Sequence, residues 1–206
     1  MIRKCYLTEW FFFRRKLLPI FVILLLFFIS MAFLGYDYFI RHPDKAKSKI
    51  YEYGDILSKG GFFSENSFKV FMKLFLNNLI ASFGTVSLSF IPFLFLPVVT
   101  ILIFGISIGL VFSANSLSIN IDQLSLLLSI LPHSILEIPA IIYASSIGIY
   151  LNIQISKKVI PWTRHNSPSF SNLCKDAGRS FCLIIVPLLL VAAFIEAFIT
   201  PQTPWP

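Results

Sequence analysis

Charged residues are scarce in this sequence of 206 residues, since Asp, Glu, Lys and Arg together make up 13% of it. Soluble domains carry about a quarter, so this composition excludes a water-soluble globular protein. It also excludes a disordered chain, which needs low hydrophobicity and high charge. Hydrophobic residues make up 56% of the sequence, and Phe alone occurs 23 times. The composition therefore indicates an integral membrane protein.

Cysteines are few, and the motifs of common catalytic sites are missing. Cys5, Cys174 and Cys182 lie at scattered spacings, so they give neither a disulfide framework nor a CxxC pair. The sequence has no Walker A, GxGxxG or GxSxG motif, which excludes nucleotide handling and acyl transfer on those patterns. No cofactor is expected, and if ATP drives this protein, a separate chain supplies the ATPase.

Long hydrophobic runs are the main positive feature. The first, residues 17–39, is long for the apolar region of a signal peptide, so we interpret it as an uncleaved signal anchor. The second, residues 68–113, is too long for one span, because a helix needs about 20 residues to cross a membrane. Pro92 and Pro97 near its middle predict a turn. We therefore expect a hairpin of two spans, at residues 70–91 and 97–112.

The next apolar run, residues 124–155, is also too long for a single span. As one helix it would reach about 48 Å, against a hydrocarbon core of about 30 Å. Pro132 and Pro139 interrupt the run, so we expect a helix break at Pro132 and a span over 132–152. The piece before Pro132 would lie at the interface or re-enter the membrane, and if it crossed, the spans would number six. The last span is expected at 181–200.

Basic residues suggest the orientation of these spans. Arg14, Arg15 and Lys16 directly precede the first span, and the segment 156–180 carries five basic residues and one acid. Four spans separate these two basic regions, so both can be cytoplasmic together, as the positive-inside rule requires. The net charge of +7 then reflects orientation and gives no reason to expect a nucleic-acid partner.

The sequence thus predicts an all-α multipass transmembrane bundle of about five spans with a broken fourth helix. It is a single membrane domain in the cell membrane, with a cytoplasmic N-terminus and an extracytoplasmic C-terminus. Its parts are the N-terminal segment 1–16, the first span 17–39, an outer polar segment 40–67, a four-span core 68–200 and an outer tail 201–206. In the outer polar segment an apolar stripe that faces the membrane interface is expected at Tyr51, Tyr53, Ile56 and Leu57.

Small residues recur at four-residue spacing in two of the spans. The first set is Gly105, Gly109 and Ser113, and the second is Ala140, Ala144 and Gly148. This spacing lets helices approach closely within lipid. Packing within the chain is the favoured interpretation, and a homo-oligomer stays open as the alternative.

A few polar residues lie within the expected spans: Asn77, Asn78, His133, Glu137 and Glu196. An ionisable group in a span costs about 3 kcal/mol on insertion scales, so it suggests a function. Counted along their helices, the amides and the two carboxyls reach similar depths in the outer half of the membrane. We predict a shared polar site there, open to the outside, for a peptide, a lipid headgroup or a partner's helix. Alternatively, Glu137 is held alone by neighbouring groups and Glu196 extends outward to the headgroups. His133 and Glu137 are both residue types that bind zinc, but two ligands do not make a metal site.

Four segments carry a resemblance to a known family: FLNNLIASFG at 75–84, GISIGLVFSAN at 105–115, LPHSILEIPA at 131–140 and LLLVAAFIEAFITP at 188–201. In their order and spacing the chain resembles the stage II sporulation protein M (SpoIIM) family over roughly residues 68–201. It departs from the family pattern at Ser134, where Gly is common. The resemblance implies a multipass, non-enzymatic fold. In that family, the namesake looks like a scaffold for cell-wall-degrading partners during engulfment, and other relatives accompany ABC ATPases in circular bacteriocin export and immunity.

Three functions compete on this basis. The first is a scaffold that binds membrane or envelope proteins, such as a cell-wall hydrolase, in sporulation or cell-wall remodelling. The second is a permease-like subunit of a peptide or bacteriocin exporter that works in transport with a separate ABC ATPase. The third, an intramembrane metal-dependent hydrolase, is the weakest, because the chain has one His and two deep acids in its spans without a recognised catalytic spacing. Membrane lipid is the remaining expected partner.

Overall fold

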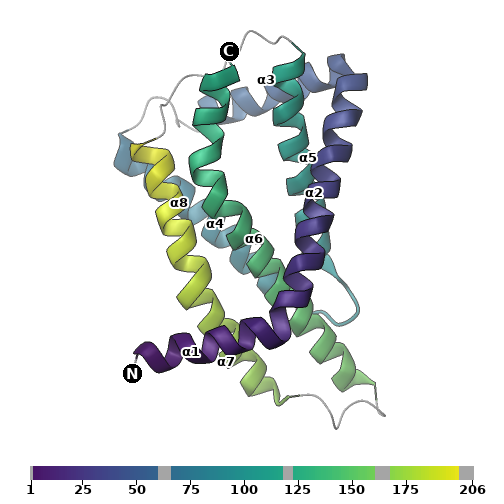
Figure 1. Cartoon of the computed structure of the whole chain (residues 1–206), viewed down its shortest axis with the longest axis vertical. Coiled ribbons are helices and arrows are strands. Elements are labelled where there is room, and N and C mark those ends of the chain that lie inside the picture. Colours follow the sequence, from purple (N-terminus) through teal and green to yellow (C-terminus); the bar gives the residue numbers. More distant parts are fainter. Residues whose placement is uncertain (1, 60–65, 118–122, 161–167, 200–206) are drawn as a thin grey trace.

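The computed structural model describes residues 2–59, 66–117, 123–160 and 168–199. Every regular element in these ranges is a helix (Figure 1). Five helical segments are long and apolar enough to cross a membrane: Arg3–Arg41, Ser67–Leu88, Leu96–Ala114, Ser134–Val159 and Phe170–Phe198. The predicted all-α multipass bundle is confirmed.

The N-terminal helix bends sharply before it enters the first span. Helix α1 (Ile2–Phe12) lies across one end of the bundle, and α2 (Leu18–Arg41) rises from it (Figure 1). A π-helical turn, η1 (Phe13–Leu17), joins them, and the side chain of Leu17 is fully buried there. Helix α2 matches the predicted first span, whereas the segment before it was expected only as a basic terminus. We call this end of the bundle the α1 end.

Helix α3 (Pro43–Lys59) lies at the opposite end, called here the α3 end (Figure 1). Among its described side chains, Ala46 and Ile50, one helical turn apart, are buried and pack against Phe39 of α2 and residues of α5. Tyr51 of the expected interfacial stripe has a side chain that is 56% exposed. One residue is a rotation of about 100°, so a buried Ile50 turns Tyr51 away from the bundle. The structure does not describe the side chains of Tyr53, Ile56 and Leu57.

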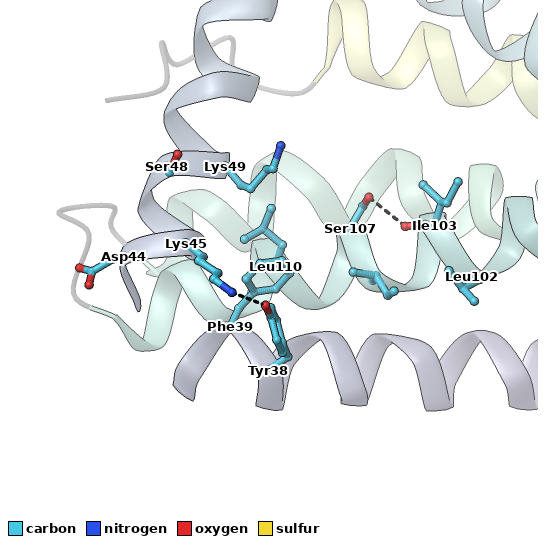
Figure 2. Close-up of a pocket in the computed structure, with 11 residues that line it drawn as sticks. Tyr38, Phe39, Asp44, Lys45, Ser48, Lys49, Leu102, Ile103, Ser107 and Leu110 are labelled. Atoms are coloured by element: carbon cyan, nitrogen blue, oxygen red, sulfur yellow. Dashed lines mark hydrogen bonds between the residues drawn. The ribbon is translucent and has the colours of Figure 1, made fainter. Parts of the chain in front are cut away.

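Helix α3 is also held to the first span by a polar contact. Lys45 donates a hydrogen bond to the hydroxyl of Tyr38 at 3.0 Å, and its ammonium lies 5.5 Å from the centre of that ring (Figure 2). Contacts between cations and aromatic rings contribute about 0.5–1 kcal/mol at exposed sites. Residues 43–59 of the predicted outer polar segment therefore form a helix that lies on the ends of α2 and α5.

The predicted hairpin is present as α4 (Ser67–Leu88) and α5 (Leu96–Ser116). Asn66 caps α4, because its side chain accepts a hydrogen bond from the Phe68 amide at 3.1 Å. In the turn, Phe93 takes a φ of 64°, which non-glycine residues seldom adopt. Pro97 lies in the first turn of α5, where its missing N–H leaves no helical hydrogen bond unmade.

The fourth span corrects a prediction, because α6 (Gln123–Val159) continues through Pro132 without a break. Proline removes one hydrogen bond and clashes with the preceding turn. Membrane helices tolerate this loss when neighbouring groups and local adjustments satisfy the freed backbone. Figure 1 shows that α6 changes direction along its length instead of ending. The piece before Pro132 is thus part of the same helix.

The last span is longer than predicted. Helix α7 (Phe170–Ser180) continues through a π-helical turn, η3 (Phe181–Ile185), into α8 (Val186–Phe198). Much of the expected loop 156–180 is therefore helical, since α6 also extends to Val159. Ser169 caps α7 by accepting a hydrogen bond from the Asn172 amide at 3.3 Å. Leu173 and Ala177, four residues apart, are buried and fix the helix against the bundle.

Helices α2 and α5 touch backbone to backbone. A Cβ at Gly109 would lie 2.6 Å from the Tyr36 amide nitrogen and would collide with a carbonyl of α2. One at Gly105 would lie 3.0 Å from the Phe28 carbonyl oxygen, and Ser113 on the same face is fully buried. The first set of small residues therefore packs within the chain.

The second set lies on α6, which is the central helix of the bundle. It packs against α2, α4, α5 and α8. Ala140 and Ala144 belong to the main buried cluster, together with residues of η1, α7 and α8. A Cβ at Gly148 would collide with the Ser89 side chain and lie 2.7 Å from Pro97 Cγ. These small residues let α6 approach the hairpin closely.

Candidate functional site

Three spans meet in a polar cluster in the half of the bundle toward the α3 end. Asn78 of α4 makes a side-chain hydrogen bond with Glu137 of α6. Glu196 of α8 lies near enough to Glu137 for the two carboxyls to interact electrostatically. All three side chains are partly buried. The mutual packing of α4, α6 and α8 thus collects one amide and two carboxyls, which we call the carboxyl cluster.

Two of the predicted site residues are not part of the carboxyl cluster as described. Asn77 is exposed on the surface of the bundle, because α4 turns its other face to α6 and α8. The side chain of His133 lies outside the described ones, although its backbone belongs to α6. Among the described residues, no group of three or more His, Cys, Asp or Glu side chains gathers in a way that could hold a metal. The carboxyl cluster therefore offers hydrogen-bonding groups.

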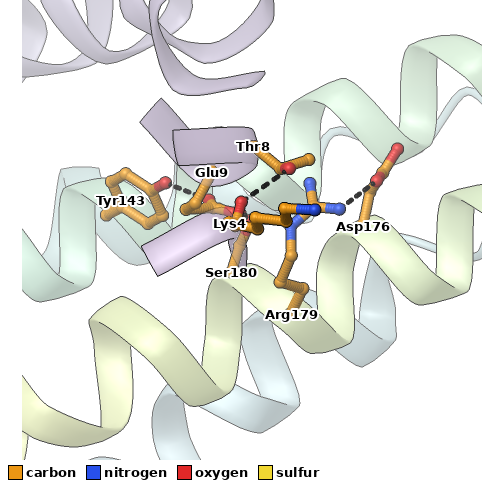
Figure 3. Close-up of polar contacts among 7 residues, drawn as sticks. All are labelled: Lys4, Thr8, Glu9, Tyr143, Asp176, Arg179 and Ser180. Atoms are coloured by element: carbon orange, nitrogen blue, oxygen red, sulfur yellow. Dashed lines mark hydrogen bonds and ion pairs between the residues drawn. The ribbon is translucent and has the colours of Figure 1, made fainter. Parts of the chain in front are cut away.

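A second cluster at the α1 end was not predicted, and it surrounds Glu9 (Figure 3). The Glu9 side chain is 2% exposed. Its carboxylate accepts hydrogen bonds from the Tyr143 hydroxyl at 2.6 Å, the Ser180 hydroxyl at 2.5 Å and Arg179 Nε at 2.8 Å. Arg179 also pairs with Asp176 at 3.0 Å. We call these five residues the Glu9 cluster.

The Glu9 cluster joins three parts of the chain that lie far apart in the sequence. Glu9 comes from α1, Tyr143 from α6, and the remaining three residues from α7. The Arg179 guanidinium also lies 5.5 Å from the centre of the Phe12 ring on α1. Desolvating a carboxylate is expensive, and several charge-assisted hydrogen bonds are needed to offset the cost. The cluster thus fixes α1 across the ends of α6 and α7.

A faint sequence signal for this cluster exists. Glu9 is the only acid among the first 36 residues, in a segment with five basic residues before the first span. An isolated acid on a basic, aromatic segment is a candidate for a buried ion pair. Its partners cannot be read from the sequence, because they lie 134 and 170 residues further along.

Asn152 makes a third polar contact that the sequence analysis did not single out. Its side-chain amide, on α6, donates to the carbonyl oxygens of Ser89, Ile91 and Leu94 at 3.3, 2.6 and 3.1 Å. Ser156, one turn further on, accepts a hydrogen bond from the Phe93 amide at 2.9 Å. These carbonyls lie in the turn that follows α4, and Asn152 donates to all three. This contact is structural, because it fixes the α4–α5 turn.

One of the comparisons with known proteins finds a match. A family model described as stage II sporulation protein M matches residues 22–201, which is most of the chain. The match includes α4, α5, α6 and α8 and most of α2, and therefore the carboxyl cluster. Searches of curated proteins and of solved structures find no match to the chain.

Proposed function

The chain belongs to the stage II sporulation protein M family, and from this we propose that it is a non-enzymatic membrane scaffold that binds partner proteins of an envelope complex. A cell-wall hydrolase that spans the membrane is the class of partner we propose. The observation that carries the proposal is an exposed polar side chain in the middle of a span. Asn77 is the eleventh of the 22 residues of α4, and its amide faces away from the bundle.

A partner helix can approach α4 closely beside this amide. Ala81, one turn after Asn77, is exposed as well. A Cβ placed on Gly84 would meet no atom within 4 Å. Small residues that face outward at these spacings are typical of helix–helix contacts in lipid, and an Asn amide hydrogen-bonds across such contacts for about 0.6–2 kcal/mol. We call Asn77, Ala81 and Gly84 the α4 docking face.

The positions of the basic residues favour an orientation that suits an envelope role. The α1 end carries Arg14, Arg15 and Lys16 as well as α7, whereas α3 lies at the other end (Figure 1). Two regions rich in basic residues therefore share one end of the bundle, which favours a cytoplasmic α1 end under the positive-inside rule. The carboxyl cluster and α3 would then be nearer to the cell wall.

Site-specific photo-crosslinking in native membranes tests the proposal. A photoactivatable amino acid is placed at Asn77 or at Gly84, and the crosslinked proteins are identified by mass spectrometry. Ser30 is the matched control position, because it is a small, exposed residue in the middle of another span. We expect a defined envelope protein at the two α4 positions, and a hydrolase among them. Crosslinks to lipid alone, or the same proteins from Ser30, would contradict the scaffold.

An alternative is a permease-like subunit of a peptide or bacteriocin exporter, which works with a separate ABC ATPase. The observation that favours it is the exposed basic surface of the α1 end, to which Lys175 on α7 also contributes. Such a surface suits an acidic partner in the cytoplasm. Probes at Arg15 and Lys175 that capture an ATPase, with no envelope protein captured from the α4 docking face, would favour this alternative.

A further inference from the structure

A groove opens between α2, α3 and α5 at the α3 end of the bundle. Its volume is about 620 Å³, and it is lined mainly by apolar side chains of α5 and by polar side chains of α3 (Figure 2). The apolar wall consists of Leu102, Ile103, Ile106 and Leu110. Tyr38 and Phe39 of α2 close the other side. The groove thus has an apolar wall and a polar rim.

The apolar wall follows the direction of a span. The residues from 102 to 110 rise about 12 Å along α5, which is a large part of the length of an acyl chain in one leaflet. Ile103 is 58% exposed, so the wall is open to a molecule in the surrounding membrane. The Ser107 hydroxyl donates to the Ile103 carbonyl oxygen at 2.9 Å, so it is satisfied within its own helix. This wall therefore suits a hydrocarbon chain.

The polar rim is positively charged toward the groove. Lys45 and Lys49, one turn apart on α3, both line it. Figure 2 shows the Asp44 carboxylate pointing away from the α5 wall. Lys45 contacts the neutral Tyr38 hydroxyl, and Lys49 pairs with Glu52 at 2.6 Å, with both side chains more than half exposed. Exposed pairs of this kind are weak, so a phosphate can compete for these ammonium groups.

We propose that this groove binds an anionic phospholipid, with the headgroup phosphate on Lys45 and Lys49 and an acyl chain along the α5 wall. The position agrees with this ligand, because α3 lies on the ends of two spans, at the depth of the headgroups. The charge distribution selects an anionic lipid over a zwitterionic one, since only the former keeps a net negative charge for the two lysines. The site does not involve the α4 docking face.

Native mass spectrometry of the purified full chain tests the proposal. The protein is reconstituted with equal amounts of phosphatidylglycerol and phosphatidylcholine that have the same acyl chains, and the lipids retained after extraction are counted. We expect the wild-type chain to retain phosphatidylglycerol preferentially. Each lysine near an anionic headgroup contributes about fivefold in affinity, so the K45Q/K49Q variant should lose more than about tenfold of this preference.

Two further variants separate the groove from general surface charge. Lys47 is exposed on the same helix but does not line the groove, so K47Q should keep the preference. I103W fills the wall without changing any charge and should also reduce lipid retention. Equal losses in K47Q and K45Q/K49Q, or unchanged retention in I103W, would overturn the proposal. The proposal would also be overturned if soluble glycerol phosphate displaced phosphatidylglycerol as effectively as the whole lipid does, because the acyl chain would then contribute nothing to binding.

Discussion

Replacing the buried Glu9 by Gln should destabilise the chain far more than a single charge change at its surface. The substitution keeps the size of the side chain and removes the negative charge that Arg179, Tyr143 and Ser180 surround. Removing one partner of a buried ion pair costs about 3–5 kcal/mol. The Arg179 side chain is 23% exposed and keeps its contact with Asp176, so the lower end of this range applies.

A loss of about 3 kcal/mol should lower the melting temperature measurably. For a chain of this length, each 1 kcal/mol corresponds to roughly 2–4 °C, so we expect a fall of roughly 6–12 °C for E9Q in detergent or nanodiscs. The matched control is D37N, which breaks the Asp37–Arg41 pair with its N–O distance of 3.0 Å on α2. Both of those side chains are exposed, and such pairs contribute about 0.5 kcal/mol or less.

A double-mutant cycle isolates the ion pair from other effects of the substitution. E9Q, R179Q and the double variant are compared with the wild-type chain by thermal unfolding. Residues in one hydrogen-bonded network show coupling energies of about 0.5–3 kcal/mol, and the burial of Glu9 places the expected value above about 1.5 kcal/mol. A coupling near zero, or a fall for E9Q no larger than that for D37N, would refute the role of the Glu9 cluster in fixing α1.

Two further predictions concern backbone packing and the hairpin turn. G109A should destabilise the chain by about 1–3 kcal/mol in thermal unfolding, because the added Cβ would meet backbone atoms of α2 that cannot move aside. G84A, where a Cβ meets open space, should leave stability unchanged or slightly raised, and equal effects would contradict the close contact. N152A should speed amide hydrogen exchange across residues 89–95, since the carbonyls of Ser89 and Ile91 lose the Asn152 donor and that of Leu94 keeps only the Leu96 amide. S145A removes a buried hydroxyl without a hydrogen-bond partner among the described residues, so it should leave the exchange unchanged. Equal exchange in the two variants would contradict the role of Asn152 in fixing the α4–α5 turn.

The spans could be predicted because membrane insertion depends on composition and length. The hairpin was predicted for the same reason, since two prolines interrupt a run twice as long as a span, and Pro97 indeed lies in the first turn of α5. Pro132 shows the limit of this reasoning. A proline costs one hydrogen bond, and whether the helix ends or merely bends depends on the neighbouring helices, which the sequence does not specify. The helical structure of α7 was missed because it is polar and amphipathic.

The polar contacts differ in how far they can be predicted from the sequence. Counting residues along helices placed the Asn77–Asn78 amides, Glu137 and Glu196 at similar depth, and in the structure Asn78 and the two carboxyls interact. Which of two adjacent amides faces inward depends on the rotation of α4, and that rotation placed Asn77 outside. Predicting the Glu9 cluster would have required the position of α1, which is set by a π-helical turn at Phe13–Leu17. No local pattern predicts that turn.

The distribution of burial is compatible with the partner-binding role that we propose. In the most apolar part of each span, 56% of residues are buried in α6, whereas the other four spans have 17–33% buried. The bundle is thus one central helix with four peripheral ones, in each of which most residues are at least partly exposed to lipid or to other proteins. Lipid alone suffices for the apolar part of this surface. It does not satisfy the amide of Asn77 in the middle of α4, where an unmade hydrogen bond is costly. A partner helix would satisfy that amide, which is why we expect the α4 docking face, rather than an enclosed active site, to carry the proposed function.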